Sequence, residues 1–340
     1  MTVDLRPWLG AVPDAVGQRI MTARRALVAS HENPDADTLG AALGVAAIVE
    51  RYGGTATLIC ADPVPPLYDF LPGMDRVRPD PDPAFDPDLL VVCDCGSLDR
   101  LGELGVRHAE LFARLPRVIV DHHASNTAAG ATDWVDPAAA ATCEMVGLLA
   151  VRLGVPLDAN GGGLAAVLMA GLVMDTSTFA HPNVTPRTLA VAAALVEAGA
   201  PLAEISRRLY RSKPDAQLRL FGRVLDRLES AAGGRIVSSY LLDADLVETG
   251  TISAHSEGII DLLSQAEDAD VAILFKEAGP DVTRVSVRTR HGGVDATQLT
   301  GAFGGGGHAR AAGASLTAPL ADARKRVLAE AERLVAAVPR

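Results

Sequence analysis

Side chains that can bind metal ions or transfer protons are gathered at four places in the sequence. Each place comes directly after a short apolar run, the pattern expected where a buried element ends and a polar loop begins. The residues are His31, Asp35 and Asp37 in the first group, Asp94 in the second, Asp121, His122 and His123 in the third, and Asp175 in the fourth. Aspartate oxygens and histidine nitrogens are natural ligands of divalent metal ions. The residue types therefore predict a two-metal site.

The spacing within the first group supports this interpretation. His31, Asp35 and Asp37 lie four and then two residues apart, on a turn that a proline stiffens. The two aspartates could each hold a different ion. Without cations, carboxylates brought together would repel one another, and some would be forced to take up protons. As an alternative, Asp35 and Asp37 could only cap the helix that follows. Four such groups in succession favour the metal site.

The apolar runs before these groups predict a parallel sheet. Continuous apolar strands that alternate with helical segments are typical of a parallel sheet covered by helices on both faces. The predicted strands are Ala26–Ser30, Thr55–Cys60, Leu89–Cys95 and Arg117–His122, and the predicted helices are Thr38–Tyr52, Ala138–Leu153, Gly163–Met174 and Pro186–Ala198. Ligands of such sheets bind beyond the carboxyl ends of the strands. We therefore expect the four groups to converge.

The second half of the chain predicts a smaller α/β domain. Its predicted strands are Ile236–Leu241, Val271–Lys276 and Val282–Thr289, and its predicted helices are Glu257–Ala266 and Leu320–Val338. We expect residues 1–200 to form the first domain and residues 235–340 the second, with the active site in the cleft between them. Residues 201–234 would form a helical linker, whose arginines are either a solvated face or a basic rim for an anionic substrate.

A glycine cluster in the second domain is a candidate anion site. Residues 304–307 are all glycine and precede His308. Glycines let backbone N–H groups approach an anion closely, and Arg288 on a predicted strand supplies a planar guanidinium that can grip a phosphate. A flexible tether is the alternative. The candidate substrate-binding residues are Arg288, Gly305, Gly306, Gly307 and His308.

Taken in order, these motifs resemble those of the DHH phosphoesterase superfamily. His31-x-x-x-Asp35-x-Asp37, Asp94, Asp121-His122-His123 and Asp175 are similar to its four motifs. The segment Gly304–His308, followed by Ala311-Ala312-Gly313, resembles the GGGGH signature of the associated C-terminal domain, DHHA1. The length and the C-terminal domain are most similar to the oligoribonuclease/pAp-phosphatase subgroup, also called nanoRNases. The resemblance implies a parallel-sheet DHH domain and a smaller α/β DHHA1 domain.

The resemblance also implies a role for each residue of the metal site. The implied ligands are His31, Asp35 and Asp94 for one ion and Asp37, Asp94, His122 and Asp175 for the other, with Asp94 bridging. Manganese suits imidazole ligands better than magnesium, which is the alternative ion. Two ions about 3.5–4 Å apart can activate a shared water for attack on phosphorus. His123 would polarise the phosphoryl group or protonate the leaving oxygen, and Asp121 would orient its neighbours.

The substrates implied by the resemblance are short oligoribonucleotides (nanoRNA), pAp and, for some members, cyclic di-AMP, acted on by a homodimer. Two other functions use the same residues. An inorganic pyrophosphatase shares the metal motifs, but the segment Gly304–His308 counts against it. A non-catalytic nucleotide-binding module is the third interpretation. Loss of a metal ligand would indicate such a module, and every expected ligand is present.

The amino-acid composition argues against two classes of binding partner. The 340 residues include 31 basic and 42 acidic side chains, a formal charge of −11. This balance argues against docking on anionic membranes and against sequence-independent binding of long nucleic acids. The longest apolar stretch, Leu164–Met174, is too short to span a bilayer, and the first residues lack the pattern of a secretory signal. The four cysteines form no CxxC pair, so we expect a cytoplasmic protein.

Overall fold

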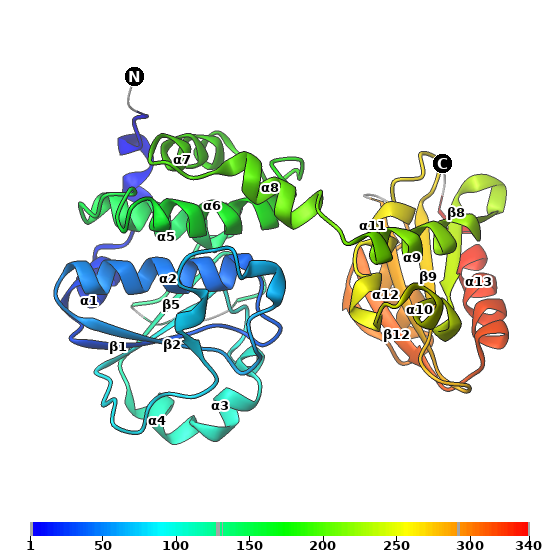
Figure 1. The fold of residues 1–340 in the computed structure, drawn as a ribbon, viewed down its shortest axis with the longest axis horizontal. Coiled ribbons are helices and arrows are strands. Elements are labelled where there is room, and N and C mark those ends of the chain that lie inside the picture. The colour runs from blue at the N-terminus through cyan, green and yellow to red at the C-terminus, as the bar shows by residue number, and fades with distance from the viewer. Residues whose placement is uncertain (1–2, 127–129, 131, 291–292, 339–340) are drawn as a thin grey trace. The chain divides into compact units, whose positions relative to one another are not determined.

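The computed structural model describes residues 3–126, 130, 132–290 and 293–338. The chain forms two compact units, Met1–Ser212 and Lys213–Arg340, called unit 1 and unit 2 below (Figure 1). The division falls inside the segment 201–234 for which the sequence predicted a linker. Helix α8 (Leu202–Tyr210) belongs to unit 1 and helix α9 (Asp215–Asp226) to unit 2.

Unit 1 is built on a six-stranded sheet in which all neighbouring strands are parallel. In spatial order the strands are β3 (Val77–Arg78), β2 (Thr55–Ile59), β1 (Arg25–Ala29), β4 (Leu89–Cys93), β5 (Arg117–Asp121) and β6 (Trp134–Val135). The helices besides α8 are α1 (Asp14–Thr22), α2 (Ala36–Arg51), α3 (Glu103–Arg107), α4 (Ala109–Arg114), α5 (Thr142–Arg152), α6 (Gly163–Thr176) and α7 (Pro186–Glu197). The predicted parallel sheet is confirmed.

Helices cover both faces of this sheet, as its apolar strands predict. Figure 1 shows α2, α5, α6 and α7 in layers on one side of the sheet and α3 and α4 on the other. The larger core lies under α2, α5 and α6, whereas a smaller cluster including Leu101 and Leu104 packs against the opposite face. Helix α6 is buried from Leu164 to Val173, because helices surround it.

Two glycines allow α2 and α6 to approach each other at the predicted metal site. A Cβ atom on Gly40 would lie 2.5 Å from the Val167 carbonyl oxygen. A Cβ atom on Gly171 would lie 2.5 Å from Asp37 Oδ1 and 2.4 Å from Cys143 Sγ. Any larger residue would clash there, since real Cβ atoms do not approach backbone so closely. The absence of side chains at these positions brings α6 next to Asp37.

Unit 2 has a mixed sheet with its own core. In spatial order the strands are β11 (Gly306–His308), β12 (Ala311–Leu316), β10 (Thr283–Thr289), β9 (Val271–Glu277), β8 (Ile236–Leu241) and β7 (Glu229–Ala231). Only β8 and β9 are parallel; the other pairs are antiparallel. The helices besides α9 are α10 (Asp243–Thr249), α11 (Ile259–Leu263), α12 (Ala296–Gly301) and α13 (Leu320–Ala336).

The two faces of the second sheet are covered differently. Helices α12 and α13 pack on one face, over the alternate residues of β9, β10 and β12 that form the larger core of this unit. Helices α9 and α11 pack on the other face, mainly over β8 and β9. The remaining strands therefore present outward-facing residues on that second face, including Arg284 of β10 and Gly313 of β12, which are exposed.

Most predicted elements are present, with differences at their ends. The strand expected at Leu89–Cys95 ends at Cys93, and the helix expected at Glu257–Ala266 is only the short α11. The glycine run, for which no strand was predicted, partly forms strand β11. In the part of the chain that the structure describes, no single helix is long and apolar enough to span a membrane. Helices α7 and α8 would have the length and composition only if taken together, and they are bent by 112°.

Candidate metal centre

The site begins at the point where the strand order of unit 1 reverses. Strand β1 has β2 on one side and β4 on the other, so the chain leaves β1 and β4 in opposite directions across the sheet. Such a switch point opens a crevice at the carboxyl ends of the two strands. His31 follows β1 and Asp94 follows β4, and His31 Nε2 lies 3.5 Å from Asp94 Oδ2. Both side chains are 2% exposed.

The two aspartates of the first group lie at the start of α2. Asp35 is the N-cap of this helix, because its Oδ1 accepts hydrogen bonds from the N–H groups of Asp37 and Thr38 at 2.9 and 3.0 Å. The capping role considered from the sequence is therefore real for Asp35. The same cap fixes the carboxylate beside Asp94, and one oxygen can cap while the other binds a cation. For this residue capping and metal binding are compatible.

Asp37 makes a different contact. Its two carboxylate oxygens accept hydrogen bonds from Thr142 N at 2.7 Å and Cys143 N at 2.8 Å, the first two residues of α5. The positive end of the α5 dipole therefore faces a carboxylate that is completely buried. This contact explains why α5 begins at Thr142 rather than at the predicted Ala138. Asp37 thus joins α2 to α5 within the site.

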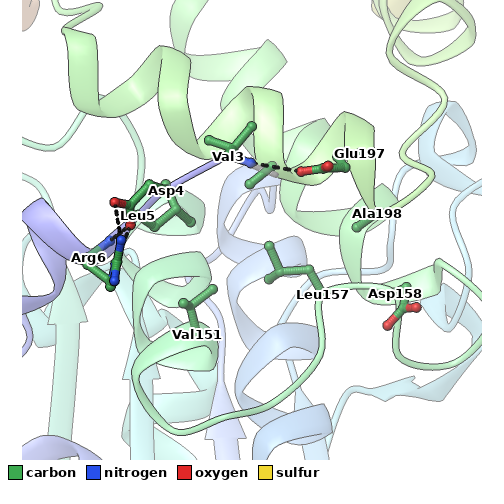
Figure 2. Close-up of a pocket in the computed structure, with 10 residues that line it drawn as sticks. Val3, Asp4, Leu5, Arg6, Val151, Leu157, Asp158, Glu197 and Ala198 are labelled. Atoms are coloured by element: carbon green, nitrogen blue, oxygen red, sulfur yellow. Dashed lines mark hydrogen bonds and ion pairs between the residues drawn. The ribbon is translucent and has the colours of Figure 1, made fainter. Parts of the chain in front are cut away.

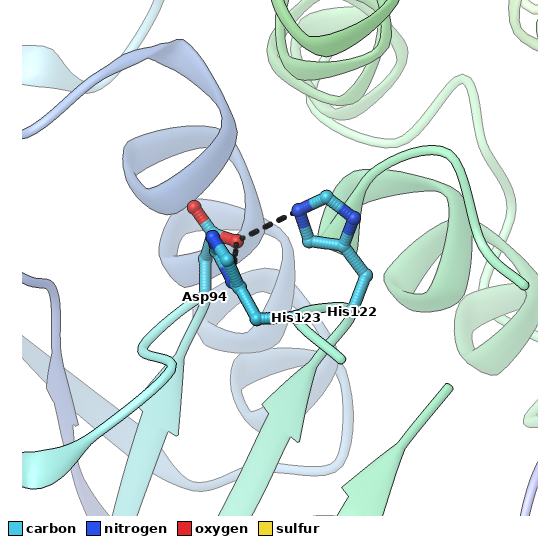
Figure 3. Close-up of side chains that lie close together, drawn as sticks. All are labelled: Asp94, His122 and His123. Atoms are coloured by element: carbon cyan, nitrogen blue, oxygen red, sulfur yellow. Dashed lines mark ion pairs between the residues drawn. The ribbon is translucent and has the colours of Figure 1, made fainter. Parts of the chain in front are cut away.

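The third and fourth groups complete the cluster from β5 and α6. His122 Nε2 lies 3.0 Å from Asp175 Oδ2 and 3.4 Å from Asp94 Oδ1. His123 Nδ1 lies 2.7 Å from Asp121 Oδ1 and 3.6 Å from Asp94 Oδ1. Figure 3 shows dashed lines from both imidazoles to the Asp94 carboxylate, which follows the end of β4. Asp121 is fully buried, so it fixes the orientation of the His123 ring.

Three sets of ligand atoms in this cluster lie within 4.8 Å of one another. They are His31, Asp35 and Asp94; Asp37, His122 and Asp175; and Asp94, His122 and His123. The first two sets contain the residues that the resemblance implied for two separate ions. Asp94 belongs to the first and third sets, and its Oδ1 lies 3.4 Å from Nε2 of His122, a member of the second set. The structure thus brings together all six of the expected metal ligands.

The protonation of these groups shows that the cluster suits cations. Burial and the nearby charges of Asp94 and Asp175 raise the pKa of Asp35 to about 6, and burial with the same two charges raises the pKa of Asp37 well above its usual range. Burial alone would lower the pKa of His122, but the carboxylates of Asp175, Asp37 and Asp94 raise it to about 10. The donor atoms therefore fit divalent cations, which would remove the repulsion between the carboxylates.

The backbone at Asp94 is held in an unusual conformation. Its φ angle is +55°, in the left-handed region that side chains other than those of Gly, Asn and Asp seldom adopt. The Asp94 N–H donates to the Val120 carbonyl at 2.9 Å, which continues the contact between β4 and β5 by one residue. This turn carries the carboxylate into the middle of the cluster, so the strained residue is the one that contacts both halves of the site.

Several residues that support the cluster were not predicted from the sequence. Thr142 Oγ1 donates to Asp94 Oδ1 at 3.0 Å, and Arg100 Nη2 lies 3.3 Å from His31 Nδ1. A basic side chain six residues after Asp94 was the available signal for Arg100. Behind α5, the buried Glu144 accepts hydrogen bonds from Arg187 Nε and from Thr188 Oγ1. Nothing in the local sequence connects these last residues, which are more than 40 positions apart.

The predicted substrate residues of unit 2 lie on or beside strands β10, β11 and β12. Gly306 and His308 pair with Gly313 and Ala311 of β12, and all four are exposed or half-exposed. A Cβ atom on Gly307 would lie 2.6 Å from the Ala311 carbonyl oxygen, so glycine is needed for this close backbone approach. These side chains and backbone groups are open to a ligand.

Two of the predicted anion-binding groups already have protein partners. The Gly305 N–H donates to the Thr300 carbonyl at 2.9 Å, so Gly305 shapes the turn rather than offering that N–H to an anion. Arg288 Nε donates to Asp261 Oδ1 at 3.0 Å and its Nη1 donates to the Val287 carbonyl at 3.3 Å, so Nη2 is the nitrogen of this guanidinium without a described protein partner. The four cysteines are free and buried, and burial raises the pKa of each thiol.

A separate pocket lies away from this cluster. Figure 2 shows it between the first described residues, the end of α5 and the end of α7. Its lining includes Val3, Val151 and Leu157, and the Val3 N–H donates to Glu197 Oε2 at 3.0 Å. It contains none of the predicted site residues. The pocket therefore adds nothing to the chemistry of the metal centre.

Two protein-family models match the chain. Residues 25–172 match the model of the DHH family, N-terminal domain, and residues 233–337 match the DHHA1 domain. The first match contains every predicted metal ligand except Asp175, and the second contains the glycine cluster. The chain belongs to the DHH/DHHA1 phosphoesterase family, as its motifs indicated.

Individual relatives agree with this assignment. The chain is 34% identical over 303 residues to the bifunctional oligoribonuclease and PAP phosphatase NrnA of Thermus thermophilus, with 88% of this chain and 87% of the relative covered. It is 26% identical over 308 residues to the protein of the same description from Bacillus subtilis, covering 89% and 92%. The fold is similar to that of an exopolyphosphatase-related protein from Bacteroides fragilis, with a TM-score of 0.82, 20% identity, and 94% and 95% covered.

Proposed function

We propose that this protein is a metal-dependent hydrolase of short nucleotides, cleaving nanoRNA and pAp, with cyclic di-AMP as a further substrate. The observation that carries the proposal is the convergence of six side chains in one cluster, of which three are buried (His31, Asp37 and Asp94) and three are partly buried (Asp35, His122 and Asp175). The relatives described as oligoribonuclease and PAP phosphatase align over most of the chain, which supports the choice of substrate. We propose manganese as the metal because imidazole nitrogen is a poor ligand for magnesium.

The proposed ligands divide between two ions. His31, Asp35 and Asp94 would hold the first; Asp37, Asp94, His122 and Asp175 would hold the second. Bound divalent ions supply an activated water and neutralise charge on the phosphoryl oxygens. The protein supplies their fixed positions. Asp35 is held as a helix cap, and Asp37 by the N–H groups of α5. Such prior fixing of groups avoids rearrangement during the reaction.

His123 is the proposed general acid. Its Nδ1 lies 2.7 Å from Asp121 Oδ1, so the Nδ1–H group can donate a hydrogen bond to this carboxylate, which orients the ring. Nε2 is then the atom that can donate a proton to the leaving oxygen of the substrate. Asn126 Nδ2 donates to Asp121 Oδ2 at 2.6 Å and keeps that carboxylate in place. Because the His123 side chain is 31% exposed, the ring can reach a bound ligand.

Unit 2 is proposed to bind the end of the substrate that is not cleaved. The proposed contacts are the Arg288 guanidinium, the His308 ring and the backbone of Gly306 and Gly307, because these groups are exposed or half-exposed along β10 and β11. A binding surface of three short strands suits a small ligand better than a long polymer. The Arg288→Ala substitution should therefore raise KM while leaving the metal content unchanged.

The proposed function is tested by comparing turnover of pAp, a diribonucleotide, cyclic di-AMP and pyrophosphate, with Mn²⁺ and with Mg²⁺. Asp94→Asn keeps a residue that tolerates a positive φ but removes the charge between the two sets of ligands. Hydrolysis should fall by more than about a hundredfold, because partners outside the ligand set alone cost about 10–100-fold. Asp99→Asn, an exposed aspartate nearby, is the matched control.

The outcomes separate the three candidate functions. Undiminished activity in Asp94→Asn would contradict the two-metal site. Turnover of pyrophosphate alone would favour the pyrophosphatase, against which the DHHA1 match at residues 233–337 counts. Binding of nucleotides without turnover of any substrate would indicate the non-catalytic module. We further propose that the protein is cytoplasmic, because its cysteines are free. The family resemblance suggests a homodimer, and sedimentation would measure the oligomeric state.

A further inference from the structure

We propose that Lys276 and Arg284 form a second anion-binding position in unit 2, which holds a backbone phosphate of an oligonucleotide. This position is distinct from the one assigned above to Arg288 and His308. The proposal depends on the proposed function for the class of ligand, a short single-stranded nucleic acid. It adds a reason why the protein would distinguish oligonucleotides from a single nucleotide such as pAp.

The pairing of strands places the two cations together. Arg284 lies directly opposite Lys276 in the antiparallel pair of β10 and β9. Paired residues of neighbouring strands project from the same face of a sheet. Along β10, Arg284, Ser286 and Arg288 alternate with buried residues and so share that face. It is the face that α9 and α11 cover mainly over β8 and β9.

The area between the two positions has a low, flat surface. Ser286 pairs with Gly313 of β12, and Gly313 pairs with Gly306 of β11. Gly306 and Gly313 are exposed, and Ser286 is half-buried. Because glycine has no side chain, the sugar and backbone of a nucleotide could lie close to the strands here. This face of the sheet therefore has cationic side chains at both ends and small residues between them.

The electrostatics of the pair favour an anion. Like charges directly opposite each other on neighbouring strands are destabilising. Among the residues that the structure describes, neither Lys276 nor Arg284 has a salt bridge, although Glu257 lies near enough to favour the charged form of Lys276. Lys276 Nζ donates to Ser256 Oγ at 2.8 Å, and burial lowers the pKa of this lysine, as do Arg284 and Arg288. A bound phosphate would stabilise both cations.

Arg288 is arranged differently from Arg284. Its guanidinium has a carboxylate partner, Asp261 of α11, at 3.0 Å. Arg284 lies four residues away on the same strand, about 14 Å at the usual rise per residue. This separation suits two different phosphates of one chain better than a single phosphate. The strand would therefore contact an oligonucleotide at two points, and pAp at the Arg288 point alone.

The test measures binding to the protein carrying Asp94→Asn, in which cleavage of the ligand is expected to be lost. The probes are pAp and 5′-phosphorylated oligoadenylates of two to five nucleotides, each measured over a range of salt concentrations. Arg284→Gln should weaken binding of the longer oligonucleotides on the order of tenfold, because a charge-assisted contact is lost. The slope of log Kd against log salt concentration should fall by about 0.7 for the same ligands. Binding of pAp should be unchanged.

Lys276→Gln provides a second variant, and Lys325→Gln is the matched control, because Lys325 lies on α13, which packs on the opposite face. Equal binding of all lengths by Arg284→Gln and Lys325→Gln would overturn the proposal, and so would an equal loss for pAp. Turnover by the protein without substitutions is measured in parallel. If no nucleotide is cleaved, the proposed function fails; if nucleotides are cleaved but Arg284→Gln binds normally, only the second position fails.

Discussion

The buried ion pair behind α5 allows a quantitative prediction for the substitution Glu144→Gln. Glu144 is completely buried and accepts hydrogen bonds from Arg187 Nε, Thr188 Oγ1 at 2.7 Å and Ala140 N at 3.2 Å. Removing one partner of a buried ion pair costs about 3–5 kcal/mol, since the other charge stays buried. Arg187 keeps Asp136 at 2.8 Å, so we expect the lower value, about 3 kcal/mol.

The assay can follow unit 1 by itself. Both tryptophans of the chain, Trp8 and Trp134, belong to unit 1, so their fluorescence in urea reports the unfolding of that unit. With a urea dependence of about 2–3 kcal/mol per molar, a loss of 3 kcal/mol moves the midpoint down by about 1–1.5 M. Glu204→Gln is the control, because Glu204 pairs with Arg208 at the surface, and exposed pairs contribute about 0–1 kcal/mol.

The same substitution should weaken metal binding. Ala139 O lies 3.4 Å from His122 Nδ1, and two N–H groups at the start of α5 hold Asp37, so the backbone that Glu144 anchors contacts two of the proposed ligands. We expect a 10–100-fold loss of Mn²⁺ affinity, which calorimetry measures. If Glu144→Gln moves the midpoint no further than Glu204→Gln does, the ion pair is not a major contributor to stability and the reasoning is refuted.

Three further predictions concern pH, metal and the glycine hairpin. Because the pKa of Asp35 is raised to about 6, its share of the stability of the metal-free protein is present below about pH 4 and is lost as the pH rises to 6, about 3 kcal/mol in all. Asparagine is also a good helix cap, so Asp35→Asn should lack this pH dependence. In EDTA, the difference in free energy of unfolding between the variant and the wild type should therefore shift in favour of the variant by about 3 kcal/mol between about pH 4 and pH 6. A difference that stays constant over these pH values would contradict the prediction. Mn²⁺ at about 100 times its Kd should raise the free energy of unfolding by about 2.7 kcal/mol, and an Mn²⁺ response in Asp94→Asn equal to that of the wild type would count against the ligand set. Gly307→Ala would place a Cβ atom 2.6 Å from the Ala311 carbonyl oxygen, so KM for pAp should rise with no change in the tryptophan midpoint, whereas Gly301→Ala, with open space around it, should have no effect.

The sequence predicted the parts of the site that depend on residue type and order. Four polar groups after apolar runs were expected to converge, and His31 and Asp94 do meet where the strand order reverses between β1 and β4. This inference was possible because parallel strands place their carboxyl ends at one edge, whatever the details of packing. The order of the strands was not needed to predict that the groups would meet.

Features that depend on contacts between distant segments were not predicted. The start of α5 at Thr142 is set by Asp37, which is more than 100 residues away in the sequence. The pairing of Glu144 with Arg187 links two helices whose sequences give no sign of each other. The glycine run was interpreted as an anion site or a flexible tether, and no strand was predicted there because glycine is unfavourable in strands. Its partial pairing as β11 depends on the close approach of β12, which only the tertiary structure shows.

The left-handed backbone of Asp94 has a consequence for how this family could change over evolutionary time. In its proposed role as a metal ligand, the residue at this position needs both a backbone with a positive φ and a charged oxygen. Asparagine meets the first requirement and glycine meets it best, whereas glutamate would keep the charge at the expense of the backbone. A descendant that gave up catalysis but kept the fold should therefore carry asparagine or glycine at position 94. The residue at position 94 would therefore distinguish a relative that has lost catalysis from one that has kept it.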